Sequence, residues 1–535
     1  MFDARLSYGS QNTVQIAGGV GGPLGSAFSY RIDGSYRRSD GYVDRGESQS
    51  LALSGALRFA PTAAFTLTLR NDYGDQRPTE YFGTPLIAGQ LDTANRRRNY
   101  NVADAEIHYR DNRTTLAAEW QIADGITVTN TAYRLTSKRL FKNLETYRFN
   151  AASRLIDRSD NLGIIHDQEQ YGDEGAIRIS RPIGGVANDL VVGFDVNLVN
   201  LTYSHDFGSL PQRDSVNPFA FNPGLFFDTQ GIAPRFRSRT TEFSVFAEDR
   251  LKLSEKLSVV GGLRYERNHV DRWNFVYSGS TISGETQVLD KSLQNTTWRV
   301  GAVYQPIPTL SLYGQYSTGT DPLGTLTTFA PNQSQFKNTT GDQVEAGIKY
   351  SFLDGRGAAT LAAYRIVKKN LLVRDPNNLR NTTPLQIGQR SAKGIEASIT
   401  LDLVAGFGID ANATVLDATF DSFNTGGVSF NGKTPPRIAE QAANLSLRWD
   451  ASDRLQARAI LRYVGPTYSD NANLFRVPGY AVVDGGMTYA VTTNIALEAR
   501  VYNLFDKNYA VTSYADEQYI LGRPRSFDVA VRARF

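Results

Sequence analysis

The chain has 535 residues and a nearly balanced charge, with 57 Lys and Arg residues against 54 Asp and Glu residues and a formal net charge of +3. This small surplus gives no support for nucleic-acid binding. The absence of cysteine excludes disulfide bonds, thiolate metal sites and cysteine nucleophiles. Mean hydropathy is -0.35 and no long apolar run is present, so we expect no transmembrane helix.

Alternation of apolar and polar residues begins near the N-terminus, where residues 5–20 are expected to form two β-strands. A period of two indicates strands with one apolar and one polar face. Ser, Thr, Asn, Arg, Glu and Asp fill the polar positions. The clearest apolar stripes are Leu51, Leu53, Gly55, Leu57 and Phe59; Phe65, Leu67 and Leu69; Ile395, Ala397, Ile399, Leu401 and Leu403; and Ala443, Leu445, Leu447 and Trp449.

Short turns separate these strands in pairs, and Gly, Pro, Asn and Asp supply the backbone geometry that such turns need. We expect ten of them, at residues 22–24, 60–62, 123–125, 182–185, 253–256, 306–308, 353–355, 405–406, 451–453 and 491–494. Longer connections lie between them, including residues 76–97, 204–237, 319–339, 421–436 and 506–518. If both termini lie on the side of the short turns, ten turns predict about 22 strands.

The C-terminal strand has the same pattern. Phe535, Ala533, Val531, Val529 and Phe527 share one face, while the other face carries both signs of charge. A soluble sandwich could end in this way, but bacterial outer-membrane barrels also finish on such a strand with a terminal aromatic residue. The pattern is uniform, so we predict an all-β fold: a single closed antiparallel transmembrane β-barrel over residues 1–535, with short periplasmic turns and long extracellular loops. The 27 Tyr and 28 Phe residues fit its aromatic girdles.

Several segments of the last 200 residues together resemble one family, the TonB-dependent outer-membrane receptors in their ferric-siderophore branch. They read QVEAGIKY (343–350), KNL (369–371), GQRSAKGIE (388–396), GKTPP (432–436), PGYAVVD (478–484) and NLFDKNY (503–509), followed by GRPR (522–525) and the terminal Phe535. The N-terminal half resembles the family more loosely, through residues 30–32 and 81–83.

The resemblance implies a multi-pass β-barrel of the outer membrane that imports ferric siderophores with energy from the TonB complex. Outer-membrane lipid is its other implied partner, and nucleic acid is not one. Family members also carry an N-terminal plug domain. Because residues 5–20 already fit barrel strands and no basic and apolar leader precedes them, we expect the plug domain and the signal peptide to be absent from this chain. The alternatives are a receptor for cobalamin, haem or oligosaccharide on the same fold, or a passive pore.

Candidate ligand-binding residues lie on or beside the third long connection. They are Tyr73, Tyr81, Phe82, Arg96 and Arg97, and in ferrichrome-type receptors an aromatic-Gly segment at the place of Phe82 contacts the siderophore. Aromatic faces and guanidinium groups suit a bulky, often anionic chelate whose iron is already coordinated. The alternative for the aromatic residues is the membrane-interface girdle. No hydrolase, metalloprotease or nucleotide-binding motif is present and the four histidines are scattered, so we expect no catalytic residue, cofactor or metal site.

Overall fold

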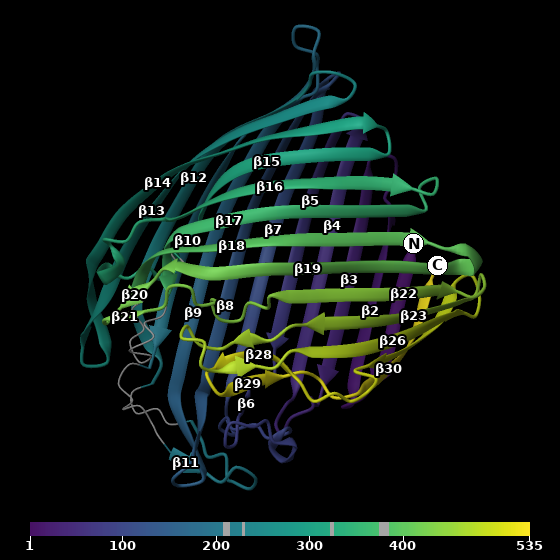
Figure 1. Ribbon diagram of the computed structural model, residues 1–535. Coiled ribbons are helices and arrows are strands. Elements are labelled where there is room, and N and C mark those ends of the chain that lie inside the picture. The colour runs from purple at the N-terminus through teal and green to yellow at the C-terminus, as the bar shows by residue number, and fades with distance from the viewer. Residues whose placement is uncertain (207–213, 227–230, 322–325, 374–384) are drawn as a thin grey trace.

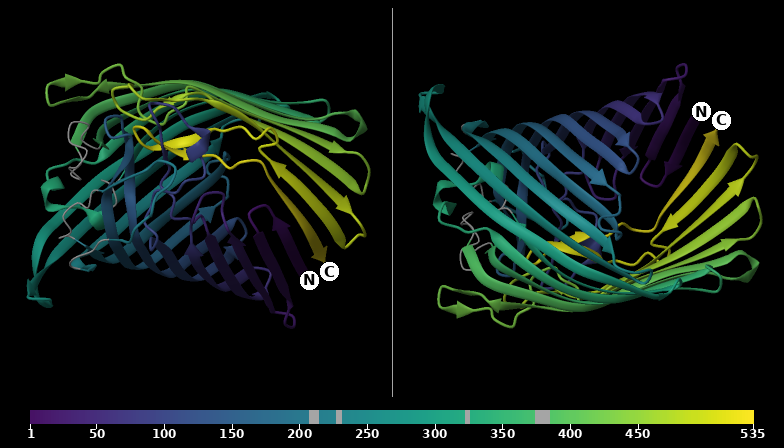
Figure 2. Two further views of the ribbon diagram at one scale, coloured as in Figure 1. Left: turned by 90° about the horizontal axis from the view of Figure 1, so that it is seen from below. Right: turned by 90° about the horizontal axis from the view of Figure 1, so that it is seen from above.

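The computed structural model describes all of the chain except residues 207–213, 227–230, 322–325 and 374–384. Its strands lie side by side in one antiparallel ring around a lumen (Figures 1 and 2). In the described residues the main sheet has 23 strands, of which β11 (Asp214–Val216) pairs with β9 alone, so 22 strands form the ring as predicted. They are β1 (Phe2–Gly9), β2 (Thr13–Pro23), β3 (Phe28–Ser39), β4 (Ser48–Thr62), β5 (Phe65–Arg77), β7 (Glu106–Ala123), β8 (Ile126–Asn150), β9 (Leu155–Ile179), β10 (Ala187–His205), β12 (Ala233–Lys252), β13 (Leu257–Ser278), β14 (Thr281–Ile307), β15 (Leu310–Asp321), β16 (Thr339–Phe352), β17 (Gly357–Val373), β18 (Leu385–Asp402), β19 (Phe407–Ser422), β22 (Gln441–Asp450), β23 (Leu455–Val464), β26 (Tyr480–Ala490), β27 (Ile495–Tyr502) and β30 (Ser526–Arg534).

The ring closes where the first and last strands meet. β1 and β30 pair antiparallel, with Gly9 opposite Asp528 near one end of the ladder. At the other end Phe2 and Phe535 exchange two backbone hydrogen bonds of 2.7 Å each. Closure leaves no open strand edge, which is the condition for a β-structure surrounded by lipid.

Both termini lie at the end of the barrel that carries the short turns (Figure 1), which we call the turn end. All ten predicted turns lie at strand junctions there. The opposite, or loop, end carries the long connections. β8 and β9 have 25 residues each and β14 has 27, whereas about 9–11 residues suffice to span a bilayer. These strands therefore extend well past the membrane at the loop end.

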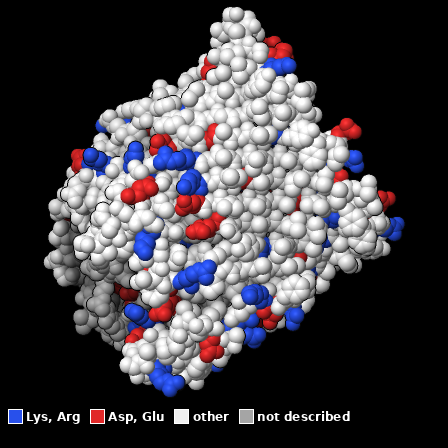
Figure 3. All heavy atoms as spheres, viewed as in Figure 1, with Lys and Arg blue, Asp and Glu red and all other residues white. Residues whose placement is uncertain are grey.

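Side chains alternate between the outside of the ring and its lumen. Leu53 and Leu57 of the predicted stripe face outward and are 47% and 41% exposed, with Leu69 of β5 in register beside Leu57. Exposed apolar groups at every second position suit a surface covered by lipid. On the face drawn in Figure 3, a broad uncharged area separates the charges near the turn end from those on the strand extensions.

Aromatic rings pair on the outer face close to the turn end, as a membrane-interface girdle requires. The pairs are Phe28 with Phe59 (centroids 4.7 Å apart), Phe65 with Trp120 (6.4 Å) and Phe407 with Trp449 (5.6 Å). In each pair the two residues are in register on neighbouring strands.

The long connections contain small elements of their own. They are β6 (Thr84–Pro85), β20 (Asn424–Thr425), β21 (Val428–Ser429), β24 (Thr467–Tyr468), β25 (Arg476–Val477), β28 (Ala510–Ala515) and β29 (Gln518–Leu521), and the 3-10 helices η1 (Thr93–Asn95), η2 (Leu326–Thr328) and η3 (Pro331–Gln333); η4 (Val404–Gly406) lies in a short turn. No helix in the described part of the chain is long and apolar enough to cross a membrane.

The connection predicted for residues 204–237 needs correction. It includes β11 and the first residues of β12, because β10 and β12 remain paired as far as His205 and Ala233. Residues 207–213 and 227–230 of this segment, and 322–325 of the segment predicted at 319–339, lie outside the described residues.

Buried apolar side chains gather at the loop end, where the connections pack on the strand extensions. The first cluster consists of Tyr100, Val102, Leu144, Tyr147, Ile156 and Val216. A second contains Leu86, Val477, Ala510, Tyr519 and Leu521, from connections far apart in the chain. These clusters hold the loop end together.

Candidate ligand-binding vestibule

A small three-stranded sheet joins the third and the last long connections. β29 pairs with β28 and also with β6, placing Gln518 opposite Pro85 and Tyr519 opposite Thr84. Both views of Figure 2 show β28 and β29 (yellow) inside the outline of the ring. We call β6, β28 and β29 the mouth sheet, because it lies within the loop end.

Gln518 connects the mouth sheet to β8. Its side-chain amide nitrogen donates to the carbonyl oxygens of Phe82 (2.8 Å) and Glu145 (2.9 Å). Its amide oxygen accepts from the backbone N–H of Tyr147 at 2.8 Å. Gln518 is 1% exposed, so these bonds replace water for a fully buried amide.

Other hydrogen bonds attach the last connection to several neighbouring connections. Tyr42 Oη donates to the Leu521 carbonyl (2.7 Å), Tyr519 Oη to that of Arg476 (3.3 Å), Ser469 Oγ to that of Asp516 (2.7 Å) and an Arg437 guanidinium nitrogen to that of Tyr514 (2.9 Å). The last connection is therefore held from more than one side of the barrel.

Tyr81 and Phe82, predicted from the sequence, come together at the mouth sheet. The hydroxyls of Tyr81 and Thr84 are 2.8 Å apart, and the Tyr81 ring meets that of Tyr42 edge-on at 6.3 Å. Burial raises the pKa of Tyr81. The Phe82 ring meets Tyr514 edge-on at 5.4 Å. Part of each ring is thus used to hold the mouth sheet and the connections around it in shape. We call the space that the mouth sheet, these connections and the adjoining lumen wall enclose the vestibule.

Arg96 and Arg97 follow η1 in the same connection. A guanidinium nitrogen of Arg96 lies 3.5 Å from a carboxylate oxygen of Asp506, which links the third connection to the last. The backbone N–H of Arg525, helped by the charge of Arg96, lowers the pKa of Asp506 below its usual value. Arg97 is exposed.

Tyr73, the remaining candidate, does not lie beside Tyr81, Phe82, Arg96 and Arg97. It lies on β5 opposite Leu53 in β4 and Asn112 in β7, and Leu53 faces outward. Residues in register on neighbouring strands share a face. Tyr73 therefore faces outward, as the alternative of a membrane-interface girdle requires.

A row of aromatic side chains that sequence reasoning missed lines the lumen side of five successive strands. Neighbouring ring centroids are 5.4 Å apart for Tyr109 and Phe141, 6.1 Å for Phe141 and His166, 5.2 Å for His166 and Tyr203, and 4.8 Å for Tyr203 and Phe236. We call these five residues the aromatic ribbon. The first four are half-buried, whereas Phe236 is buried.

Two arginines stack on the ends of the ribbon. The guanidinium carbon of Arg139 lies 5.5 Å from the Tyr109 ring centroid, and that of Arg272 lies 3.6 Å from the Phe236 centroid. Arg139 is exposed to the lumen beside the half-buried rings. Flat aromatic faces next to a guanidinium group can bind a bulky, partly apolar anion.

His269 corrects the expectation that the histidines are isolated. Its Nε2 lies 3.2 Å from a carboxylate oxygen of Asp271 and 3.7 Å from one of Asp290, on β13 and β14. The three possible ligand atoms lie within 4.8 Å of one another. The strand register puts these three side chains on the same face of the barrel as Leu263, which points outward. They are therefore not part of the vestibule.

The family model described as "TonB dependent receptor-like, beta-barrel" matches residues 5–504. The chain is 24% identical to the "Probable TonB-dependent siderophore receptor PiuA" of Acinetobacter baumannii over 581 positions, which cover 100% of this chain and 76% of that protein. It is also 24% identical to the "Ferrichrome outer membrane transporter/phage receptor" of Escherichia coli K12 over 550 positions, covering 95% of this chain and 70% of the relative.

The fold agrees with solved structures. The crystal structure of PiuA from Acinetobacter baumannii superposes with a TM-score of 0.87 at 20% identity and covers 100% of this chain and 81% of that one. The closed form of the receptor Fiu from Escherichia coli K12 gives a TM-score of 0.85, also at 20% identity, with the same coverage. A family match over most of the sequence, together with a closed 22-strand ring, shows that this chain is an outer-membrane β-barrel and belongs to the TonB-dependent receptor-like β-barrel family.

Proposed function

We propose that this receptor captures a ferric siderophore in its extracellular vestibule and imports it with energy supplied through TonB. The loop end is then the extracellular end. The chelate passes unchanged, so the proposal gives the protein no catalytic step. The matched relatives support it, since one is a probable siderophore receptor and another a ferrichrome transporter.

The aromatic ribbon is the structural observation that carries the proposal. A ferric siderophore encloses its iron, so a receptor has to recognise the organic surface and its charge. The half-buried rings of Tyr109, Phe141 and Tyr203 offer apolar faces, and Arg139 offers a positive charge beside them. They face the lumen, which supports a role for them in contacting a ligand that enters from the loop end.

The residues predicted from the sequence have a second role in this proposal. Tyr81 and Phe82 contact the mouth sheet, and Arg96 reaches Asp506 in the last connection. We infer that they act on the ligand partly by fixing the vestibule, while the exposed Arg97 is free to contact a chelate directly.

The test is uptake and binding of radiolabelled ferric chelates by iron-starved cells that express the complete gene product and no other ferric-chelate receptor. Hydroxamate, catecholate and citrate chelates are compared with cobalamin and haem. We expect saturable binding of one ferric chelate class and uptake that stops when the proton gradient is collapsed. Preference for cobalamin or haem would overturn the siderophore assignment and leave the family membership intact.

A further inference from the structure

A hollow of about 250 Å³ lies in the lumen wall where the ring closes. Its lining comes from β1, β2, β3, β27, β30 and the connections beside them. Small side chains line its β1 and β2 positions, at Ser7, Gly9 and Thr13. Gly9 has no room for a side chain, because a Cβ atom would lie 2.5 Å from the carbonyl oxygen of Phe527. We call this hollow the seam pocket.

Positive charge dominates the lining of the seam pocket. Arg5, Arg37, Arg500 and Arg523 come from four different strands or connections and line the pocket together with one carboxylate, Asp528. In register, Arg5, Arg37, Arg500 and Asp528 all face the lumen. The pocket lies at the loop end, since the β1–β2 turn beside it is opposite the termini.

The nearby carboxylates are already shared. Glu498, which is 7% exposed, lies 3.3 Å from Arg5, 3.1 Å from Arg500 and 3.8 Å from Arg532. Asp528 lies 3.9 Å from Arg5. The arginines are five, namely Arg5, Arg37, Arg500, Arg523 and Arg532, and the carboxylates are two, Glu498 and Asp528. This group at the seam therefore has a surplus of three positive charges.

Two of these arginines have no carboxylate within ion-pair distance in the part of the chain that is described. Arg37 is half-buried on β3. Arg523 is exposed, and its guanidinium carbon lies 4.3 Å from the ring centroid of Tyr502. Like charges held together in a partly desolvated wall cost free energy unless an anion compensates them.

We propose that the seam pocket binds an oxyanion ligand with two or more negative charges, of the carboxylate or phosphate class. A guanidinium group presents N–H donors in a planar fork that matches both kinds of oxyanion. Arg37 and Arg523 supply donors that no carboxylate of the described residues uses, and Arg5 and Arg500 add positive charge to the same lining. The inference goes beyond the proposed uptake function, because it holds whichever chelate is imported.

The balance of charge differs in the hollow next to the seam pocket. A neighbouring hollow, which includes residues of β1, β3, β5 and β7, is lined by Asp3, Asp33, Asp72 and Asp111 and by Arg70 and Arg113. Arg31, beside this lining, forms ion pairs with both Asp3 and Asp33. With Arg31 counted, four carboxylates meet three cations there, whereas the seam pocket has a basic surplus. An anion that enters the lumen is therefore attracted more strongly to the seam than to the neighbouring hollow.

The experiment is isothermal titration of the 535-residue chain, folded in detergent micelles, with citrate and with pyrophosphate at low ionic strength. Acetate and spermidine serve as the monovalent and cationic controls. We expect one molecule of citrate or pyrophosphate per chain, weaker binding at high salt and no spermidine binding at the seam. Whichever of the two anions binds more tightly identifies the carboxylate or the phosphate source.

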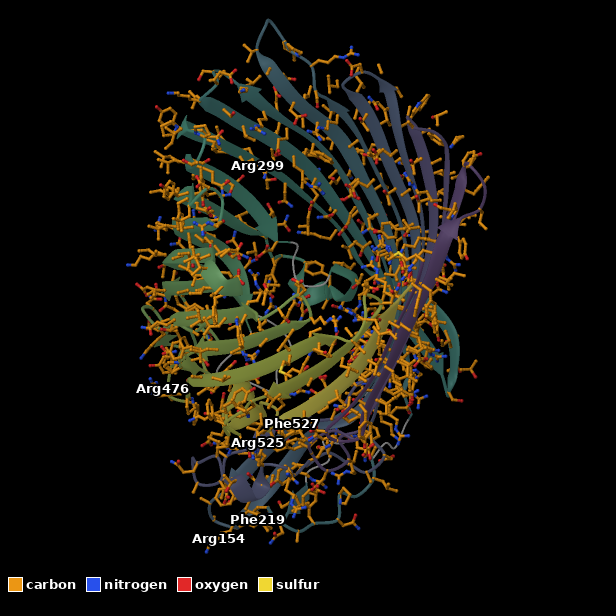
Figure 4. The ribbon with its side chains drawn as sticks, turned by 90° about the vertical axis from the view of Figure 1, so that its right-hand side faces the viewer. Arg154, Phe219, Arg299, Arg476, Arg525 and Phe527 are labelled. Carbon is orange, nitrogen blue, oxygen red and sulfur yellow. The ribbon has the colours of Figure 1, made fainter. Side chains whose placement is uncertain are left out.

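Arg37→Gln and Arg523→Gln are each expected to weaken this binding about tenfold, since each removes one charge-assisted contact. Arg299→Gln is the matched control, because Arg299 pairs with Glu248 on a part of the wall away from Arg525 and Phe527 at the seam (Figure 4).

The proposal fails if the unaltered chain binds neither anion, if both seam variants bind normally, or if Arg299→Gln loses as much affinity. Arg523 is exposed, so Arg523→Gln remains a test should Arg37→Gln not fold. A failure of the chain to bind these anions would overturn the seam proposal only. The proposed siderophore uptake is tested separately, by the variants of the aromatic ribbon.

Discussion

The side-chain amide of Gln518 donates a 2.8 Å hydrogen bond to the carbonyl oxygen of Phe82 and so joins the last long connection to the third. The two residues are 436 positions apart in the chain. Gln518 bonds Glu145 and Tyr147 of β8 with its remaining hydrogen-bonding atoms. One buried amide therefore ties together three parts of the vestibule wall.

Replacing Gln518 with Ala should loosen the mouth sheet without unfolding the barrel. The change leaves two carbonyl oxygens and the N–H of Tyr147 without their partner, and each buried unpaired group costs on the order of 1–3 kcal/mol. We expect faster hydrogen exchange in β6, in β29 and at Tyr147, measured by mass spectrometry. Gln76→Ala, at an exposed position of β5, is the control and should leave exchange unchanged.

Truncating the aromatic ribbon should weaken chelate binding. Phe141→Ala and Tyr203→Ala each remove a half-buried face worth about 1–3 kcal/mol, so we expect roughly a tenfold loss of affinity or somewhat more. Tyr73→Ala is the control, because Tyr73 shares the outward face of Leu53. Binding of the labelled chelate to cells gives the affinities. Equal losses in Tyr73→Ala and the ribbon variants would remove the ribbon as the binding surface.

Tyr81→Ala and Phe82→Ala are also expected to weaken chelate binding about tenfold, but through a different route. Both rings support the mouth sheet, so these variants should raise hydrogen exchange in β28 and β29 as well. The ribbon variants should not. A loss of affinity with unchanged exchange would instead indicate that Tyr81 and Phe82 contact the ligand directly.

The third long connection, which contains Glu80, should be more stable at mildly acidic pH than at neutral pH. Burial raises the pKa of its carboxyl group, which accepts a 3.4 Å hydrogen bond from the N–H of Ile107. A raised folded-state pKa means that the folded loop binds the proton more tightly than the unfolded loop does. The stability gained by protonation is therefore present at low pH and lost as pH rises through the folded pKa.

Glu80→Gln should remove this dependence, because the amide oxygen can still accept from Ile107 and carries no charge. The measurement is the hydrogen-exchange protection factor of Ile107 between pH 5 and 8, in the unaltered chain and the variant. We expect protection to fall with pH only in the unaltered chain. Parallel profiles in both proteins would contradict the assignment to Glu80.

Gly172 should be intolerant of substitution because the ring of Tyr133 lies on it. A Cβ atom at position 172 would come 2.3 Å from a ring carbon of Tyr133. Gly172→Ala therefore forces the ring to move, at a cost of typically 1–3 kcal/mol. Gly55→Ala is the control, because nothing lies within 4 Å of its added Cβ. Urea unfolding in lipid vesicles, followed by tryptophan fluorescence, gives the two stabilities.

The sequence alone determined the class of fold, the strand number and the face that meets lipid. Alternation such as that of Leu53 and Leu57 depends on neighbours two positions apart, and turns such as residues 491–494 depend on the conformational preferences of a few residues. Such local signals can be read from the chain in order. The motif resemblance then gave the family, and with it the expected location.

Only the tertiary structure decided which residues form the vestibule. Tyr73 and Tyr81 look alike in sequence, yet the first faces outward and the second supports the mouth sheet. A slip of one residue in strand register moves a side chain to the opposite face, so the sequence could not place Phe141 and His166 in one row. The contact between Gln518 and Phe82, like the meeting of Arg37 and Arg523 at the seam, exists because the first and last strands pair, and ring closure depends on all 22 strands together.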